Sequence, residues 1–351
     1  MLQQRNSSFE MIKVIAVVLI IFSSALPFGT TYVGGYNDVF SDLTRTAFSA
    51  EHMTMTLFRW FGQIGDTLFI SCSAWFLCDH SMIRVKRIGK IIADSWILSI
   101  LGLGVSFVFM NPTVKEVFES FFPITFQINW FVGCYILYYF AHPFLNRAVS
   151  GLDQKGLKKV VIVLLLGYSL LSTIYAVYYF TNLMAFFMIH YLVMYIKKYR
   201  IFDHPSREDI FCILAGITMI LLIILLVNYL GDRISFIRSH NLNLCKYYNP
   251  LILLISSCAI CLAAKKTFFS SVINKISSWS LLIYLIHTNH FWVTYGKYEL
   301  YQRIGVDGIL SVLKVAALYL VMIPILAFVY EASAGKLTGF LSGRIEYLMQ
   351  E

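Results

Sequence analysis

The sequence has few charged residues, and this shortage decides the class of protein. Only 13% of its 351 residues are Asp, Glu, Lys or Arg, whereas 58% are hydrophobic. A soluble globule needs a polar exterior, and a mean hydropathy of +0.71 leaves too little polar surface to make one. Acidic residues are the scarcer kind, since there are 19 of them against 28 Lys and Arg, which gives a net charge of +9. We therefore expect an integral membrane protein.

Disulfide frameworks and metal-binding clusters are also lacking. The seven cysteines are odd in number, and five of them lie inside apolar runs, so they are expected to be small buried residues. Two of these form a CxxC, but no second pair accompanies it, and no metal site is predicted. No signal-peptide cleavage site of small residues follows the first apolar run, which is expected to stay as a helix. The five cysteines are Cys72, Cys134, Cys212, Cys258 and Cys261.

Long apolar runs are what the sequence does contain. There are ten of them, most within the roughly 17–25 residues that a bilayer core requires. We expect an all-α bundle of about ten transmembrane helices that forms one domain over residues 1–351. The spans are predicted at 9–28, 57–78, 92–110, 128–146, 159–178, 181–196, 209–230, 249–264, 277–295 and 309–331.

The distribution of Lys and Arg predicts the orientation. If the N-terminus lies inside, the inner segments hold 19 Lys and Arg and the outer segments hold 8. Cytoplasmic segments of membrane proteins carry such an excess, so both termini are predicted to be cytoplasmic. The same distribution accounts for most of the positive charge, and no nucleic-acid partner is needed to explain it.

Polar groups on the first two apolar runs are candidates for a buried site. Lys13 and Ser24 lie eleven positions apart, close to three helical turns, so they share one helix face about 16 Å apart along the axis. Asp66 lies in the second run, where a charge is costly, and it is expected to face the bundle interior and to pair with Arg59 or Lys13. Such a pair fits a structural role as well as a catalytic one.

The inner loop after the second run holds a pair of arginines. Arg84 and Arg87 are spaced i, i+3 and would share a face of a helix. Two neighbouring guanidinium groups suit the phosphates of a nucleotide-like donor. The alternative is an ordinary cytoplasmic loop rich in basic residues, which composition alone favours.

The predicted outer loop, residues 29–56, mixes aromatic and polar side chains. Such a mixture suits a sugar, which needs hydrogen bonds at its edge and a flat ring against its face. An interfacial loop with aromatic anchors is an equally good interpretation. The side chains in question are Tyr32, Tyr36, Asp38, Asp42, Arg45, Glu51 and His52.

Five stretches taken in order resemble one known family. They cover residues 8–29, 65–77, 84–92, 128–146 and 280–287, and together they are similar to the membrane-bound acyltransferase family 3. That family contains bacterial O-acyltransferases of cell-surface polysaccharides and lipopolysaccharide. The similarity extends over nearly all ten predicted spans and is closest to the branch encoded with exopolysaccharide and capsule genes.

The resemblance assigns places to particular residues. The family has a basic residue in the first helix, where this chain has Lys13, and a His eleven positions later, where this chain has Ser24. Arg84 and Arg87 match the family's R-x-x-R pair, which is associated with the acyl-coenzyme A donor. Two further motifs of the family appear as Ser73-Ala74-Trp75 and as Tyr284-Leu285-Ile286-His287.

The serine at position 24 leaves the site without its usual imidazole. A general base must take the proton from the acceptor hydroxyl, and His serves because its pKa of about 6.5 lies near working pH. Ser24 can act as a nucleophile only if another group removes its proton. The candidates for that group are His287, which is the foremost, and His52, His190 and His290.

The resemblance implies a function at the membrane. We expect a multi-pass protein of the bacterial plasma membrane that moves an acetyl group from acetyl-CoA to a hydroxyl of a surface polysaccharide or its lipid-linked precursor, without a metal. Lys13 would stabilise charge on the thioester side. Two alternatives stay open: a disabled member of the family that acts as a glycan-binding or assembly partner, and a glycan transporter. The lack of an internal repeat counts against the transporter.

Overall fold

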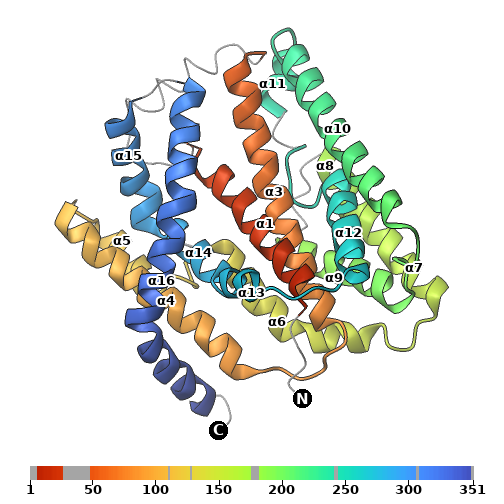
Figure 1. Ribbon diagram of the computed structural model, residues 1–351, viewed down its shortest axis with the longest axis horizontal. Helices are drawn as coiled ribbons and strands as arrows, with labels where there is room; N and C mark the ends of the chain where they lie inside the picture. The colour runs from red at the N-terminus through yellow and green to blue at the C-terminus, as the bar shows by residue number, and fades with distance from the viewer. Residues whose placement is uncertain are drawn as a thin grey trace. The chain divides into compact units, whose positions relative to one another are not determined.

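The computed structural model describes residues 6–26, 48–109, 111–126, 129–174, 182–240, 244–305 and 308–348, and over these ranges the chain is helical and contains no strand (Figure 1). The predicted all-α class is confirmed for them. Five described helical stretches are long and apolar enough to cross a membrane, which supports a membrane protein, while the ten spans and the cytoplasmic termini stay predictions. The five are α1 (Ser7–Ser24), α4 (Val85–Phe109), the continuous stretch Gln154–Thr173, α10 (Ser206–Gly231) and α16 (Gly308–Leu348).

The chain divides into two compact units. The first comprises Met1–Ser23, Ser41–Ser81 and Ala141–Ser278, and the second comprises Ser24–Phe40, Met82–Phe140 and Trp279–Glu351. Two of the boundaries fall inside α1 and inside α6 (Trp130–Ala148), so these two helices contribute residues to both units. The expectation of one domain over the whole chain stays a prediction.

In the first unit, α3 (Ala50–Leu77) packs against three other helices. These are α9 (Asn182–Lys198), α10 and α12 (Pro250–Lys265), and α10 and α12 lie side by side (Figure 1). A further helix, α7 (Gln154–Leu164), lies along α9 and continues through η1 (Leu165–Leu170) and α8 (Leu171–Ile174). The short helices α11 (Ser235–His240) and α13 (Ser271–Ser278) complete this unit.

A glycine brings α1 close to α3 in the first unit. A Cβ atom at Gly65 would lie 2.5 Å from the backbone oxygen of Ala16 and 2.7 Å from a side-chain carbon of Ile20. Only a residue without a side chain fits at this distance, so the two helices approach each other through Gly65. This contact sets how the first part of α1 lies against α3.

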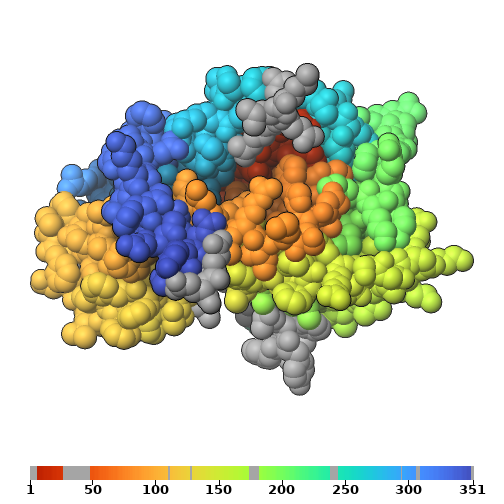
Figure 2. Space-filling view, turned by 90° about the horizontal axis from the view of Figure 1, so that it is seen from below, coloured from red at the N-terminus to blue at the C-terminus, as the bar shows by residue number. Residues whose placement is uncertain are grey.

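In the second unit, α4 and α16 pack along each other, and the blue atoms of α16 lie over the orange and yellow atoms of this unit in the space-filling view (Figure 2). Gly89 of α4 permits this approach, because a Cβ there would be 3.0 Å from the backbone oxygen of Ser342. The helix α5 (Val114–Phe121) follows α4 and begins with a capping box between Thr113 and Glu116. The helices α14 (Ser280–His287) and α15 (Lys297–Ile304) both pack against α16.

The prediction of one continuous helix over 277–295 is wrong. The helix α14 ends at His287, and a π-helical turn, η3 (Trp292–Gly296), begins five residues later. The break is held by side chains: the Thr288 hydroxyl lies 2.7 Å from Asn129 Oδ1, and Asn289 Nδ2 donates to the Leu98 carbonyl at 2.9 Å. Local polar side chains of this kind compete with the helical hydrogen bonds. His287 is therefore the last residue of a short helix, not a residue in the middle of a span.

Candidate functional site

The carboxyl end of α1 is held by two side chains of α15. Lys297 Nζ donates to the Leu26 carbonyl at 2.9 Å and lies 3.4 Å from the Ser24 carbonyl, and the Tyr301 hydroxyl donates to the Ala25 carbonyl at 2.6 Å. The last carbonyl groups of a helix have no partner within the helix, and here α15 supplies one. Lys297 and Tyr301 are spaced i, i+4 and so lie on one face of α15. Position 24 is thus fixed where α1 ends.

His287 presents an unused acceptor nitrogen in the same unit. Its Nδ1 lies 2.8 Å from the Ile283 carbonyl, which can only accept a hydrogen bond, so Nδ1 carries the proton. The Nε2 atom then has a free lone pair, and it has no hydrogen-bond partner among the described residues. The side chain is only 2% exposed. A neutral imidazole with a fixed tautomer and an open Nε2 can accept a hydrogen bond, and then a proton, from a hydroxyl placed beside it.

Lys297 interacts with two of the predicted site residues, Ser24 and His287. Its Nζ contacts the backbone carbonyl of Ser24, and its positive charge favours the neutral form of His287. Its side chain is only 4% exposed, although the predicted topology counts it among the 8 Lys and Arg of the outer segments. The second unit therefore holds Ser24, the ammonium group that binds its backbone carbonyl, and a buried imidazole.

The arginine pair lies at the start of α4, and both side chains are exposed. The backbone N–H of Arg84 donates to the Tyr139 hydroxyl at 3.3 Å, and an Nη atom of Arg87 donates to the Tyr135 hydroxyl at 3.0 Å. The Arg87 guanidinium also lies 5.6 Å from the centre of the Tyr139 ring. Two buried tyrosines of α6 thus orient the beginning of α4, while the remaining donors of the guanidinium groups face outward.

Lys13 is paired with a different carboxylate from the one predicted. Its Nζ lies 3.2 Å from Glu10, one helical turn earlier, and Glu10 is 2% exposed and also accepts a hydrogen bond from the Ser277 hydroxyl. The prediction that Lys13 pairs with Asp66 is therefore wrong, because a partner at i, i+3 on the same helix is nearer. Glu10 was not predicted as this partner, although its position three residues before Lys13 was the available signal.

Asp66 is buried in α3, as expected, but it makes no ion pair with any residue in the described ranges. The expected pair with Arg59 is therefore not formed there either. A carboxyl group buried among apolar helices is costly as an anion, so a neutral acid is the favoured form for this position.

The other candidate histidines lie elsewhere. His190 is buried in α9, and its Nε2 is 2.8 Å from Asn146 Oδ1, so it ties α9 to α6. His290 lies 3.3 Å from Glu116, and His52 lies in the first turn of α3. In the outer loop, Tyr32, Tyr36, Asp38, Asp42 and Arg45 lie outside the described residues.

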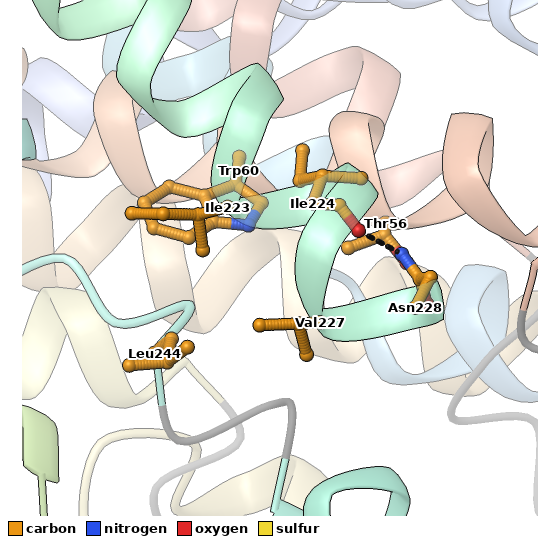
Figure 3. Close-up of a pocket in the computed structure, with 7 residues that line it drawn as sticks. All are labelled: Thr56, Trp60, Ile223, Ile224, Val227, Asn228 and Leu244. Atoms are coloured by element: carbon orange, nitrogen blue, oxygen red, sulfur yellow. Dashed lines mark hydrogen bonds between the residues drawn. The ribbon is translucent and has the colours of Figure 1, made fainter. Parts of the chain in front are cut away.

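A small pocket lies between α3 and α10 in the first unit (Figure 3). Its empty volume is about 230 Å³, below the size of usual small-molecule sites, and none of the predicted site residues lines it. Asn228 points an amide group to it and donates to the Ile224 carbonyl at 2.7 Å. The lining residues are Thr56, Trp60, Ile223, Ile224, Val227, Asn228 and Leu244. This pocket is too small to hold a coenzyme or a glycan.

These features define a helical membrane protein with a buried polar site at the end of its first helix. The sequence model of a family described as an acyltransferase domain matches residues 6–331, so the chain belongs to this acyltransferase family. No curated protein and no solved structure matches the chain. The predicted family is confirmed, whereas the exopolysaccharide and capsule branch stays a prediction.

Proposed function

We propose that this protein is an O-acetyltransferase that moves an acetyl group from acetyl-CoA to a hydroxyl of a cell-surface polysaccharide or its lipid-linked precursor, in the plasma membrane of a bacterium. Membership of the acyltransferase family supports acyl transfer. The observation that carries the assignment to a hydroxyl acceptor is the open Nε2 of His287, in the same unit as Ser24 and the arginine pair. An alcohol needs such a base, because it attacks a thioester only as its proton leaves.

The proposed reaction is a single displacement at the thioester carbonyl. The acceptor oxygen forms a bond to the carbonyl carbon while its proton passes to His287 Nε2. The carbon–sulfur bond then breaks, and the coenzyme A thiolate leaves and takes up that proton. This step requires no oxidant and no metal. Ser24, which is half-buried at the end of α1, offers its hydroxyl as a hydrogen-bonding group for the acceptor.

The donor is proposed to bind at Arg84 and Arg87. Both guanidinium groups are exposed at the first turn of α4, where the backbone N–H groups also favour an anion. Arginine holds phosphate with two parallel hydrogen bonds, which suits the phosphates of coenzyme A. Lys13 and Asp66 are proposed as accessory groups, with Lys13 stabilising charge on the thioester side.

One experiment tests the proposal directly. The purified protein in lipid nanodiscs is incubated with radiolabelled acetyl-CoA and a panel of bacterial surface polysaccharides and lipid-linked precursors, and label on the glycan is counted. We expect transfer by the native chain. Replacement of the base in His287→Gln should lower turnover by about 10²–10⁴-fold. The control is His80→Gln, because His80 is exposed.

The second candidate function is a disabled family member that binds glycans or assists assembly. The observation that favours it is Ser24 in the place where the family has His. Transfer that is absent in the native chain but present in Ser24→His would establish this alternative and overturn the enzyme. Equal transfer by the native chain and by His287→Gln would overturn the assigned base.

A further inference from the structure

Lys297 is the buried cation that the acyl-transfer scheme does not yet use. It begins α15, a helix between the ninth and tenth predicted spans, and its side chain reaches the carboxyl end of α1 instead of solvent. A lysine is rarely buried unless its ammonium group is satisfied, and here two backbone carbonyls receive it. The carboxyl end of a helix carries partial negative charge, which favours a cation at this place.

The surroundings of Lys297 join the parts of the site. The Ser24 carbonyl lies 3.4 Å from its Nζ, and its positive charge favours the neutral form of His287 on α14. One turn further along α15, the Tyr301 hydroxyl donates to the Ala25 carbonyl. Lys297 and Tyr301 therefore form hydrogen bonds with the three successive carbonyl groups at the end of α1. Arg303, on the same helix, is exposed and takes no part in this contact.

We propose that Lys297 is a positioning residue of the acyl-transfer site, which fixes Ser24 at the end of α1 and gives Ser24 and His287 a common positive neighbour. The catalytic role of Lys297 in this inference rests on the proposed function. Negative charge develops on the thioester carbonyl during transfer, and a fixed cation in a water-poor site favours that charge. Lys297 thus places a cation beside Ser24, the position at which the family has a histidine.

The first test needs no enzymatic activity. In the full chain carrying Ser24→Cys, the rate at which iodoacetamide labels the introduced thiol is followed against pH by mass spectrometry of the peptide. A nearby ammonium group favours the reactive thiolate. Adding Lys297→Gln, which keeps hydrogen-bond donors but removes the charge, should lower the labelling rate at pH 7 by about tenfold. Lys297→Arg should restore it, and Arg303→Gln is the matched control.

The second test uses acetyl transfer by the chain with its native Ser24. We expect Lys297→Gln to lower kcat by about tenfold with the KM for acetyl-CoA unchanged, and Lys297→Arg to recover most of it. Labelling rates that are equal with and without Lys297, or a Gln variant with native kcat, would overturn the inference. If no chain transfers acetyl while the labelling still depends on Lys297, the proposed function fails and the placement of the charge stands.

Discussion

Glu10 and Lys13 form an ion pair inside the first unit, with Lys13 Nζ 3.2 Å from the Glu10 carboxylate. Glu10 is almost fully buried, and the Ser277 hydroxyl donates a further hydrogen bond to it. Lys13 in turn lies 5.7 Å from the centre of the Phe76 ring. The basic residue that the family places on the first helix is thus held by its own helix and by neighbours of α3 and α13.

The first prediction concerns this pair. Glu10→Ala should lower the free energy of unfolding by about 3–5 kcal/mol, because it leaves the partly buried Lys13 charge without its partner. The double variant Glu10→Leu with Lys13→Met removes both charges and should recover most of that loss, yet its acetyl transfer should stay low. Thermal unfolding followed by tryptophan fluorescence, together with turnover, measures both effects. A double variant no more stable than Glu10→Ala would contradict this account.

The second prediction concerns donor binding. Arg84→Lys and Arg87→Lys should each raise the KM for acetyl-CoA by about tenfold or more, because a point charge replaces a planar pair of donors and a charge-assisted hydrogen bond contributes about 1.5–3 kcal/mol. Turnover at saturating donor should change little. The control is Lys86→Ala, which removes an exposed cation between the two arginines. Equal effects of all three variants would mean that only the general charge of the loop matters.

The sequence predicted most helices because each one follows an apolar run long enough to cross a bilayer. It also predicted Ser24 and the arginine pair as site residues, from their helical spacing and from the family motifs, and His287 from a family motif. It missed the end of α14, since that break depends on a hydrogen bond between Asn289 and the Leu98 carbonyl, 191 positions apart. It missed Lys297 for the same reason: nothing in the local polar segment indicates that its partners lie at Ser24 and Leu26.

The third prediction concerns the pH dependence of acetyl transfer. Burial lowers the pKa of Lys297 from 10.5 to about 8. The ammonium group is therefore lost as pH rises through about 8, and turnover should fall with it. Lys297→Arg should remove this alkaline decline, since a guanidinium group keeps its proton. The titratable groups nearby are His287 from α14, on which the Lys297 charge acts, Tyr301 on its own helix, and Tyr319 from α16, which acts on Tyr301. A decline at the same pH in the Arg variant would show that another group titrates.

The fourth prediction concerns stability and pH at the loop between α9 and α10. Both ring nitrogens of His204 lie 2.8 Å from acceptors, the Ile201 carbonyl and the Asp209 carboxylate, so the charged ring fits best. The hydrogen bond to Asp209 raises the pKa of His204. The charged His204 ring contributes fully to the free energy of unfolding below about pH 6.5, the ordinary pKa of a histidine. That contribution is lost as pH rises through the raised pKa of His204. Asp209 also binds Lys265 of α12, and Asp203 lies nearby.

His204→Ala should therefore lower the melting temperature by about 2 °C at pH 6, an effect of the size expected for a partly exposed pair, and should have no effect at pH 9. Thermal unfolding at both pH values measures this. The matched control is Arg207→Ala, which removes an exposed cation from the first turn of α10. The same loss at both pH values would assign His204 a packing role instead of an electrostatic one.

The fifth prediction concerns the approach of α1 to α3. Gly65→Ala should destabilise the protein by about 1–3 kcal/mol, because its Cβ would lie 2.5 Å from the Ala16 backbone oxygen, which no side-chain rotation can move. Gly104→Ala is the control, since a Cβ there meets open space and alanine favours a helix by up to about 1 kcal/mol. The two variants should shift the melting temperature in opposite directions. If Gly65→Ala instead stabilised the protein as Gly104→Ala does, α1 would not be held by backbone contact with α3.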